Sequence, residues 1–351
     1  MARDVEKTSR AIAPPGARAR AVHDPASTNN PHGAAVTATK APTEFPQQRA
    51  VRRPGDRIFA GGAKGSGIFI LLVLAGVAAF LIGEALPALT APSEDIPGGE
   101  GLFGYVGPLV LGTLLGAVLA LLVATPLAVG IALYVTYYAP RRIAAVMGYV
   151  IDLLAAIPSV VYGFWGLVVL APTLVPFHVW AAANLGWTPF FAGPASTSGR
   201  TMFTVGLVLA VMILPIISAI SREVFSQVPA LHREAALALG ATRWEMIKMA
   251  VLPYGKSGVI AGAMLGLGRA LGETMAVAII LSGGAGATVN LISNSNPSTI
   301  ASNIALKFPE ATGLGVNTLI ASGLVLFLIT LAVNMLARWI VNRRADFSGA
   351  N

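Results

Sequence analysis

The chain has 351 residues, of which 55% are hydrophobic and only 11% are charged, and its formal net charge is +8. A soluble globular protein carries about 25% charged residues, so this composition indicates a protein whose main solvent is lipid. The absence of cysteine excludes disulfides, thiolate metal sites and cysteine nucleophiles. The four histidines are scattered and do not cluster like metal ligands.

The first region, residues 1–65, differs in composition from the rest of the chain. It is rich in Ala, Pro, Arg, Thr and Asn, has no periodic apolar pattern, and holds eleven of the 24 Lys and Arg residues. Such a segment cannot bury enough apolar surface to fold alone, so we expect a disordered basic tail. It is not a signal peptide, because no apolar core follows its first basic residues.

Six long apolar segments follow this tail. A helix needs roughly 20 apolar residues to cross a bilayer core, and the segments that qualify are Gly67–Leu89, Leu109–Tyr134, Ala144–Leu170, Phe203–Ser221, Val259–Leu281 and Gly315–Ile340. Asp152 interrupts the third segment, and Arg269 with Glu273 interrupts the fifth. The sequence therefore predicts an all-α membrane protein with six transmembrane helices.

Lys and Arg residues in the connections predict the orientation of these helices. Connections with several basic residues alternate along the chain with connections that have one or none. Basic connections stay in the cytoplasm, so we expect the N- and C-termini both to be cytoplasmic. The net positive charge is then a topology signal, and no nucleic acid is needed to explain it.

The longest cytoplasmic connection is Arg222–Ser257. Apolar residues recur in it at helical spacing on two short stretches, with Gly240 between them and Pro253 at the end of the second. Two amphipathic helices facing the cytoplasm suggest a docking surface for a soluble partner. They could instead lie on the membrane as interfacial helices.

This connection resembles the EAA loop of permease subunits in bacterial binding-protein-dependent ABC importers. The residues that carry the resemblance are Glu234, Ala235, Ala236, Gly240, Leu252 and Pro253. Ala250 stands where the family usually has isoleucine, which trims one apolar side chain from the loop. The resemblance implies that the first loop helix fits a cleft on an ATP-hydrolysing subunit and transmits its closure to the spans.

The resemblance extends over roughly residues 102–344. In this region the chain is similar to the C-type permease subunit of the phosphate-specific importer. The strings that carry it are TPLAVGIALYVTYYAP, DLLAAIPSVVYG, REAALALGATRWEMIKMAVLPYGKSG and GLGRALGETMAV. It implies a type I ABC importer permease (MetI-like) fold over residues 66–344, followed by a cytoplasmic tail at 345–351. The implied location is the bacterial plasma membrane, which the chain crosses several times.

The resemblance also implies the partners of this chain. They are a dimer of ABC ATPase subunits, a second permease of the A type, and an extracytoplasmic phosphate-binding protein. The chain itself would be a non-catalytic subunit without a cofactor, because ATP would be bound by the partner subunits. Two strings, at Tyr254–Ser257 and Gly266–Gly272, look like nucleotide-binding loops but lack the required glycine, spacing or preceding strand. A third, Leu281–Gly284, resembles the signature of ABC ATPases but falls at the outer end of a span.

Glycines of the fifth segment predict that it is packed inside the bundle. Gly262 with Gly266, and Gly268 with Gly272, are both pairs of small residues four positions apart, which let helices approach closely in lipid.

Arg269 and Glu273 are the candidate substrate residues. They are four residues apart, so they share one helix face. Charged residues at membrane depth nearly always face a bundle interior or an aqueous cavity. An arginine offers five fixed donors that match an oxyanion. Glu273 could pair with Arg269 at rest and release it when an anion arrives. The resemblance implies a role for both residues in phosphate passage. The alternative is a permanent ion pair that only fixes helix packing.

Asp152 is a weaker candidate for the substrate pathway. It lies six residues before Pro158, in a span that the proline is expected to kink. It could help to gate the pathway, or it could accept a hydrogen bond from a neighbouring backbone group.

Three rival functions remain. The cargo could be sulfate or another oxyanion in the same architecture. A stand-alone secondary transporter or channel would need no docking loop and would usually show repeated halves or broken helices in matching positions. No internal repeat is evident in the sequence. A membrane enzyme would need a cluster of His, Cys or paired carboxylates, which the sequence lacks.

Overall fold

The computed structural model describes residues 54–281 and 286–345, and every regular element within them is helical. The chain divides into two units, residues 1–61 and 62–351. Most of the predicted basic tail and the C-terminal residues 346–351 lie outside the described residues. Residues 54–65, however, belong to the first helix, α1 (Pro54–Thr90), so the predicted tail ends too late. Pro54 suits the first turn of a helix because that turn requires no N–H group.

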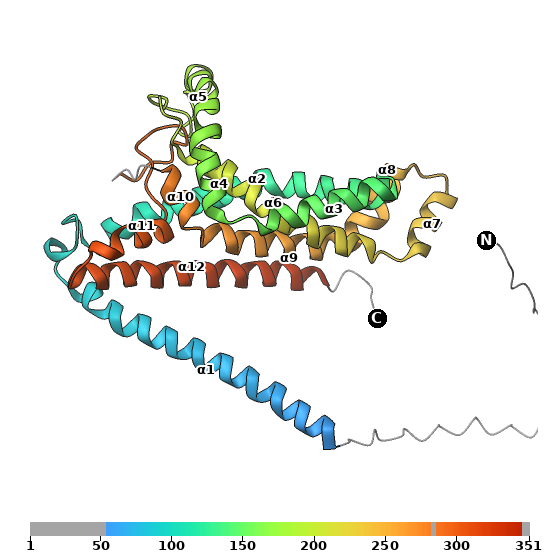
Figure 1. Cartoon of the computed structure of the whole chain (residues 1–351), viewed down its shortest axis with the longest axis horizontal. Helices are drawn as coiled ribbons and strands as arrows, with labels where there is room; N and C mark the ends of the chain where they lie inside the picture. Colours follow the sequence, from blue (N-terminus) through green and yellow to red (C-terminus); the bar gives the residue numbers. More distant parts are fainter. Residues whose placement is uncertain (1–53, 282–285, 346–351) are drawn as a thin grey trace, which may run out of the picture. The chain divides into compact units, whose positions relative to one another are not determined.

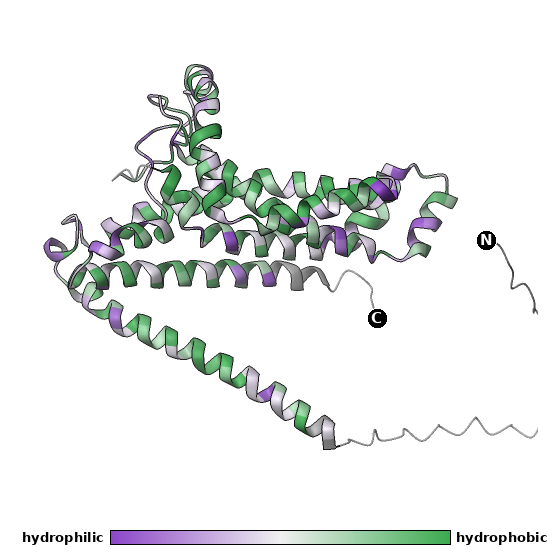
Figure 2. Ribbon diagram, in the orientation of Figure 1, coloured by the Kyte–Doolittle hydropathy of each residue, from purple (hydrophilic) through white to green (hydrophobic). Residues whose placement is uncertain are grey.

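Six helical segments in the described residues are long and apolar enough to cross a membrane: Ile58–Thr90, Gly101–Tyr138, Ser159–Leu185, Met202–Ser226, Arg243–Leu271 and Leu314–Trp339. This agrees with the predicted number of spans. The short elements between them include the 3-10 turns η1 (Ser93–Asp95) and η5 (Phe308–Glu310) and the helix α11 (Ile300–Lys307). Figure 2 shows hydrophobic residues along the long helices and hydrophilic residues on the segments that connect them.

The third span differs from its predicted position. Instead of one helix over Ala144–Leu170, the chain forms α3 (Arg141–Ala156) and then α4 (Ser159–Trp165), which continues through the π-helical turn η3 (Gly166–Leu170) into α5 (Ala171–Leu185). Pro158 is the cause, because it cannot donate to the carbonyl of Leu154 and it forces Ile157 into an extended conformation with ψ 130°. The proline therefore ends a helix rather than kinking it.

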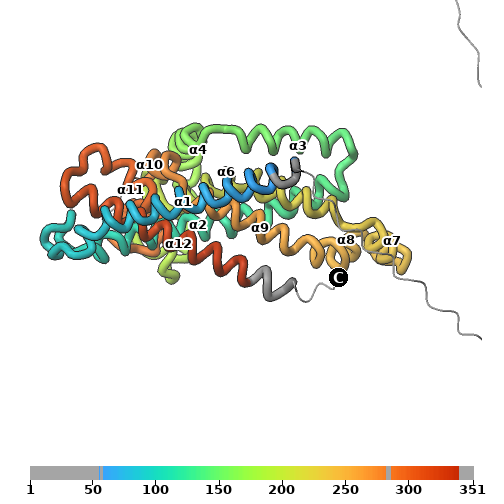
Figure 3. The backbone as a smooth tube through the Cα atoms, turned by 90° about the horizontal axis from the view of Figure 1, so that it is seen from below, coloured from blue at the N-terminus to red at the C-terminus, as the bar shows by residue number. Residues whose placement is uncertain are grey.

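The centre of the second unit, residues 62–351, is formed by three helices that run side by side (Figures 1 and 3). They are α2 (Gly101–Leu133), α6 (Met202–Ser226) and α9 (Leu252–Leu271). Buried alanines of α2 face this core at Ala117, Ala120, Ala124 and Ala128. A Cβ added at Gly206 of α6 would meet the side chain of Leu119 of α2. Small residues thus allow the two helices to approach closely, as expected in lipid.

One of the two predicted glycine pairs is confirmed as a packing contact. Cβ atoms added at Gly262 and Gly266 would lie 3.2 Å from Ile220 Cβ and 3.0 Å from Ile217 Cγ1, so this face of α9 packs against α6. The prediction is wrong for the other pair. Gly268 has no neighbouring atom within 4 Å, and Gly272 has only a carbonyl of its own helix. The face of α9 that carries Arg269 is therefore open within the described chain.

The connection predicted at Arg222–Ser257 is largely helical, and its second helix runs on into the fifth span. Its helices are α7 (Ala230–Ala238) and α8 (Arg243–Met246), and α8 continues through the π-helical turn η4 (Ile247–Val251) into α9 without a break. The prediction that Pro253 stops the second loop helix is wrong. Pro253 lies in the first turn of α9 and has no backbone N–H to donate. The wider turn of η4, directly before it, places the preceding carbonyls so that this missing donor is tolerated.

Candidate functional site

The fifth span is broken where its two charged residues lie. The helix α9 ends at Leu271, and a separate short helix, α10 (Met275–Ile280), follows. Arg269 is in the last turn of α9, whereas Glu273 lies in the break between the helices. The prediction that the two side chains share one helix face is therefore wrong. Gly272 followed by Thr274, a residue suited to begin a helix, is the sequence signal that could have predicted this break.

Glu273 and Arg269 do not form the predicted resting pair. The Glu273 side chain is 8% exposed, and its Oε1 accepts a hydrogen bond of 3.1 Å from the backbone N–H of Ala276. A carboxylate is favourable there because it satisfies an unpaired amide at a helix N-terminus. No ion pair to Arg269 forms within 4.0 Å among the described residues. The guanidinium is partly buried and has no carboxylate partner in this part of the chain.

The break in the third span lies beside the break in the fifth. The helix α4 packs against α10, and a Cβ at Gly163 would lie 2.9 Å from Ala276 Cα. Next to this glycine, the Tyr162 hydroxyl donates to the Leu154 carbonyl at 2.8 Å, replacing the N–H that Pro158 lacks. The two interrupted segments thus pack against each other directly after the break that follows Arg269.

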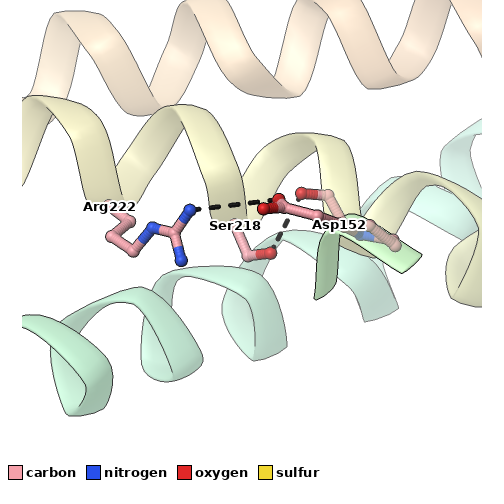
Figure 4. Close-up of polar contacts among 4 residues, drawn as sticks. Asp152, Ser218 and Arg222 are labelled. Carbon is pink, nitrogen blue, oxygen red and sulfur yellow. Dashed lines mark hydrogen bonds and ion pairs between the residues drawn. The ribbon is translucent and has the colours of Figure 1, made fainter. Parts of the chain in front are cut away.

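Asp152 is bound by a residue that sequence reasoning missed. Its Oδ1 lies 4.0 Å from Arg222 Nη2, so an ion pair joins α3 to the end of α6 (Figure 4). Gly148, one turn before Asp152, leaves room for the guanidinium, because a Cβ there would lie 2.6 Å from Arg222 Nη1. Ser218, also drawn, donates instead to the Pro215 carbonyl of its own helix at 3.0 Å. The alternative, a hydrogen bond from a neighbouring backbone group to Asp152, is not formed among the described residues, and a gating role stays a prediction.

Exchanging the two charges tests this ion pair. We expect Arg222→Asp to lower the thermal midpoint of the purified protein, because two carboxylates then face each other. Combining it with Asp152→Arg restores the midpoint in part. The coupling energy is about 1 kcal/mol or less, since both side chains are partly exposed to solvent. Additive effects of the two substitutions would show that the side chains do not interact.

The predicted coupling residues lie on and beside α7. Glu234, Ala235 and Ala236 are part of this helix, which exposes most of its side chains. Gly240 follows the helix with φ +83°, a conformation that favours glycine, so the residue is required by the turn as predicted. Leu252 and Pro253 lie in the first turn of α9.

A contact between α7 and the spans was not predicted. The Tyr137 hydroxyl, in the π-helical turn η2 (Tyr134–Tyr138) that extends α2, donates to the Phe225 carbonyl of α6 at 2.6 Å. The Arg233 guanidinium of α7 lies 5.9 Å from the centre of the same tyrosine ring. One aromatic side chain therefore contacts α6 and α7.

Comparison with known proteins identifies the family to which this chain belongs. Residues 124–346 match the family described as binding-protein-dependent transport system inner membrane component. Phosphate transport system permease protein PstC 2 of Mycobacterium tuberculosis is 44% identical over 306 residues, covering 84% of this chain and 94% of its own length. Phosphate transport system permease protein PstC of Pasteurella multocida is 44% identical over 248 residues, covering 69% of this chain and 75% of its own length.

A solved structure agrees with the fold. A chain of a bacterial alginate ABC transporter, crystallised with an alginate-bound periplasmic protein, matches with a TM-score of 0.50 at 16% identity, covering 81% of this chain and 96% of its own. The six candidate spans and the family match identify a multi-pass inner-membrane protein and a transport component. The chain belongs to the inner-membrane components of binding-protein-dependent transport systems, in the group of the PstC permeases.

Proposed function

We propose that this protein is the permease subunit that carries inorganic phosphate into the cytoplasm in an ATP-driven importer. The observation that supports this best is Arg269, a guanidinium at a break in a membrane span with no carboxylate partner among the described residues. A charge at membrane depth is costly, and such residues face a bundle interior or an aqueous pathway. A guanidinium without a fixed counter-ion is suited to an oxyanion, which can bind its planar fork with two hydrogen bonds.

The surroundings of Arg269 leave room for an anion. Gly268 and Gly272, on either side of it, are exposed and carry no side chain. The second interrupted segment packs with α4 against α10, the helix that begins directly after this break. In membrane transporters, discontinuous helices commonly form substrate sites, because their ends carry backbone groups that are not used within the helix. This geometry favours a substrate pathway over a permanent ion pair.

Glu273 favours phosphate over sulfate as the cargo. Phosphate carries a proton near neutral pH and can donate a hydrogen bond to a carboxylate, whereas fully ionised sulfate can only accept. The buried Glu273 carboxylate follows Arg269 in the same break and accepts hydrogen bonds in its ionised form. Together the two residues offer a donor for the phosphate oxygens and an acceptor for its proton. The PstC relatives, named as phosphate permeases, support the same choice.

The ATPase subunits are expected to bind the cytoplasmic loop around α7. Leu231 is 78% exposed and Leu239 is 90% exposed, although both are apolar. Exposed apolar side chains on an amphipathic helix are typical of a helix that enters a groove on a partner. Glu234, Ala235 and Ala236 lie on the same helix. We assign ATP binding to the partner subunits and no cofactor to this chain.

The remaining partners follow the same proposal. A second, A-type permease completes the pathway around the open face of α9, and an extracytoplasmic binding protein delivers phosphate to the outer loops. Both termini lie in the cytoplasm, as the basic connections predict. Pairing with a related permease is supported by α1, whose most apolar 18-residue window has no residue buried within the described chain.

Uptake of labelled phosphate tests the proposal. The assembled complex in vesicles, supplied with ATP and a loaded binding protein, is expected to take up phosphate, and a large excess of unlabelled sulfate leaves the rate unchanged. Suppression by sulfate would assign the pathway to a wider class of oxyanions. Uptake that continues without ATP and without the ATPase subunits would instead identify a secondary transporter, which the two broken helices would also suit.

A further inference from the structure

The short helix α10 lies between the break in the fifth span and the outer loops. It has only six residues, MAVAII, all of them apolar. A helix of this length is not stable by itself, because nucleation costs more than its few hydrogen bonds return. Contacts from other parts of the chain must therefore hold it in place. Since Glu273 is bound to its first turn, the position of α10 also decides where the Glu273 carboxylate lies.

Arg200 binds the other end of α10. Its Nε donates to the Ile280 carbonyl at 3.0 Å, and its Nη2 donates to the Ile279 carbonyl at 3.5 Å. These carbonyls belong to the last turn of the helix, where no backbone N–H of the helix is available. A guanidinium there also complements the negative end of the helix dipole, as the Glu273 carboxylate complements the positive end. Charged side chains of opposite sign thus bind the two ends of one short helix.

The sides of α10 are in tight contact with the third span. A Cβ at Gly163 would lie 3.0 Å from Ile279 Cδ1, and a Cβ at Gly166 would lie 2.8 Å from Ile280 Cδ1. This packing restricts sideways movement of the helix. It does not bind the carbonyls at the C-terminal end, which is the contact that Arg200 supplies.

The loop that carries Arg200 is itself fixed to the outer loop of the next connection. The backbone N–H of Met202 donates to Asn296 Oδ1 at 3.1 Å, and that of Phe203 donates to the Leu291 carbonyl at 2.9 Å. Gly199, with φ +69°, makes the turn that directs the chain into α6. Arg200 therefore projects from a fixed base and is a suitable anchor.

We propose that Arg200 is a positioning residue for the anion pathway. By binding the carbonyls of Ile279 and Ile280 it holds α10, and through α10 it holds the Glu273 carboxylate at the break beside Arg269. Arg200 does not contact the substrate. The inference rests on the proposed function for its effect on transport, but the effect on α10 can be measured without transport.

A cysteine reporter on α10 makes that measurement possible, because the natural chain has no cysteine. Val277 is 1% exposed and belongs to the core, and cysteine is close to valine in volume. We expect Val277→Cys in the assembled complex to react slowly with a water-soluble thiol reagent. Adding Arg200→Gln releases the end of α10 and raises the labelling rate by about tenfold, the effect of losing one charged hydrogen-bonding group. Arg200→Lys, which keeps the charge but not the fork, gives an intermediate rate.

Lys307→Gln is the matched control. Lys307 is an exposed cation at the end of α11 whose ammonium lies over the Tyr105 ring, 5.0 Å from its centre, so the substitution removes the same charge but no hydrogen bond to the carbonyls of α10. We expect unchanged labelling of Val277→Cys and unchanged phosphate uptake in this variant. Among the Arg200 variants, the one that is labelled fastest is expected to lose most of its maximal uptake rate. The concentration of loaded binding protein that gives half-maximal uptake stays constant.

Three outcomes overturn the inference. Labelling that Arg200→Gln leaves unchanged would show that Arg200 does not hold α10. Faster labelling with unimpaired uptake would reduce Arg200 to a structural contact. Equal effects of Arg200→Gln and Lys307→Gln would indicate a general attraction for anions. If the labelling rates follow the expected order but the complex carries no phosphate, the proposed function fails while the anchoring of α10 stands.

Discussion

Arg269→Gln is expected to reduce ATP-driven phosphate uptake by roughly 100-fold or more, because it removes both the charge and the paired donors that bind the anion. Arg269→Lys keeps the charge but loses the fork, so we expect a smaller loss of about tenfold. The measurement is uptake of labelled phosphate by vesicles that contain the assembled complex, at saturating ATP and binding protein. Arg269 makes no ion pair within the described chain, so its substitution does not leave a carboxylate without its cation, and the expected losses do not have that cause.

The control for this prediction lies on the same helix. Lys256 is an exposed cation near the start of α9, and Lys256→Gln removes one positive charge far from the break. Its uptake is expected to stay within about twofold of the unmodified complex, as is usual for an exposed surface substitution. Uptake that survives Arg269→Gln in a complex that is correctly assembled and hydrolyses ATP would remove Arg269 from the substrate pathway.

Gly199→Ala is expected to prevent the protein from assembling. Gly199 has φ +69°, where a residue with a Cβ loses about 1 to 2 kcal/mol. A Cβ at this position would also overlap the backbone carbonyl of Ala171, at the start of α5. Neither group belongs to a flexible side chain, so the backbone must move. We expect a total cost of at least about 4 kcal/mol, enough to consume much of the stability of a typical domain.

Gly193→Ala separates the two causes of this loss. Gly193 has φ +96°, but the nearest atom to its added Cβ is Asn290 Nδ2, at an ordinary 3.5 Å. This variant therefore keeps the conformational cost without the collision, and we expect normal yield with a modest fall in thermal midpoint. The yield and thermal midpoint of the purified complex measure both variants. Similar behaviour of the two would contradict the role assigned to the Ala171 carbonyl.

The sequence predicted those features that depend on composition and spacing. The number of spans follows from six apolar runs, and the packing of α9 on α6 follows from Gly262 and Gly266. Gly240 was placed correctly between the loop helices because a left-handed turn favours glycine. Each of these signals is local, so it can be read without knowing which helices are neighbours.

The sequence did not predict the geometry of the site, because hydropathy carries no information about backbone direction. The breaks at Pro158 and Gly272 interrupt apolar runs without changing their polarity. Glu273 was therefore placed on a helix face beside Arg269, whereas it binds a backbone amide of α10. The partner of Asp152 is 70 residues away in the chain, and nothing in either segment identifies the contact.

The continuity of α8, η4 and α9 joins the proposed coupling loop to Arg269 through one uninterrupted helix. From Arg243 to Arg269 the helical path is about 40 Å long at 1.5 Å per residue. A tilt of about 5° at the loop end then moves the far end by about 3 Å, comparable to the length of one hydrogen bond. Closure of two ATPase subunits around the loop would shift Arg269 by that amount without any change inside the helix. Access of the anion to its binding group would then be controlled by the tilt of one continuous helix about its loop end.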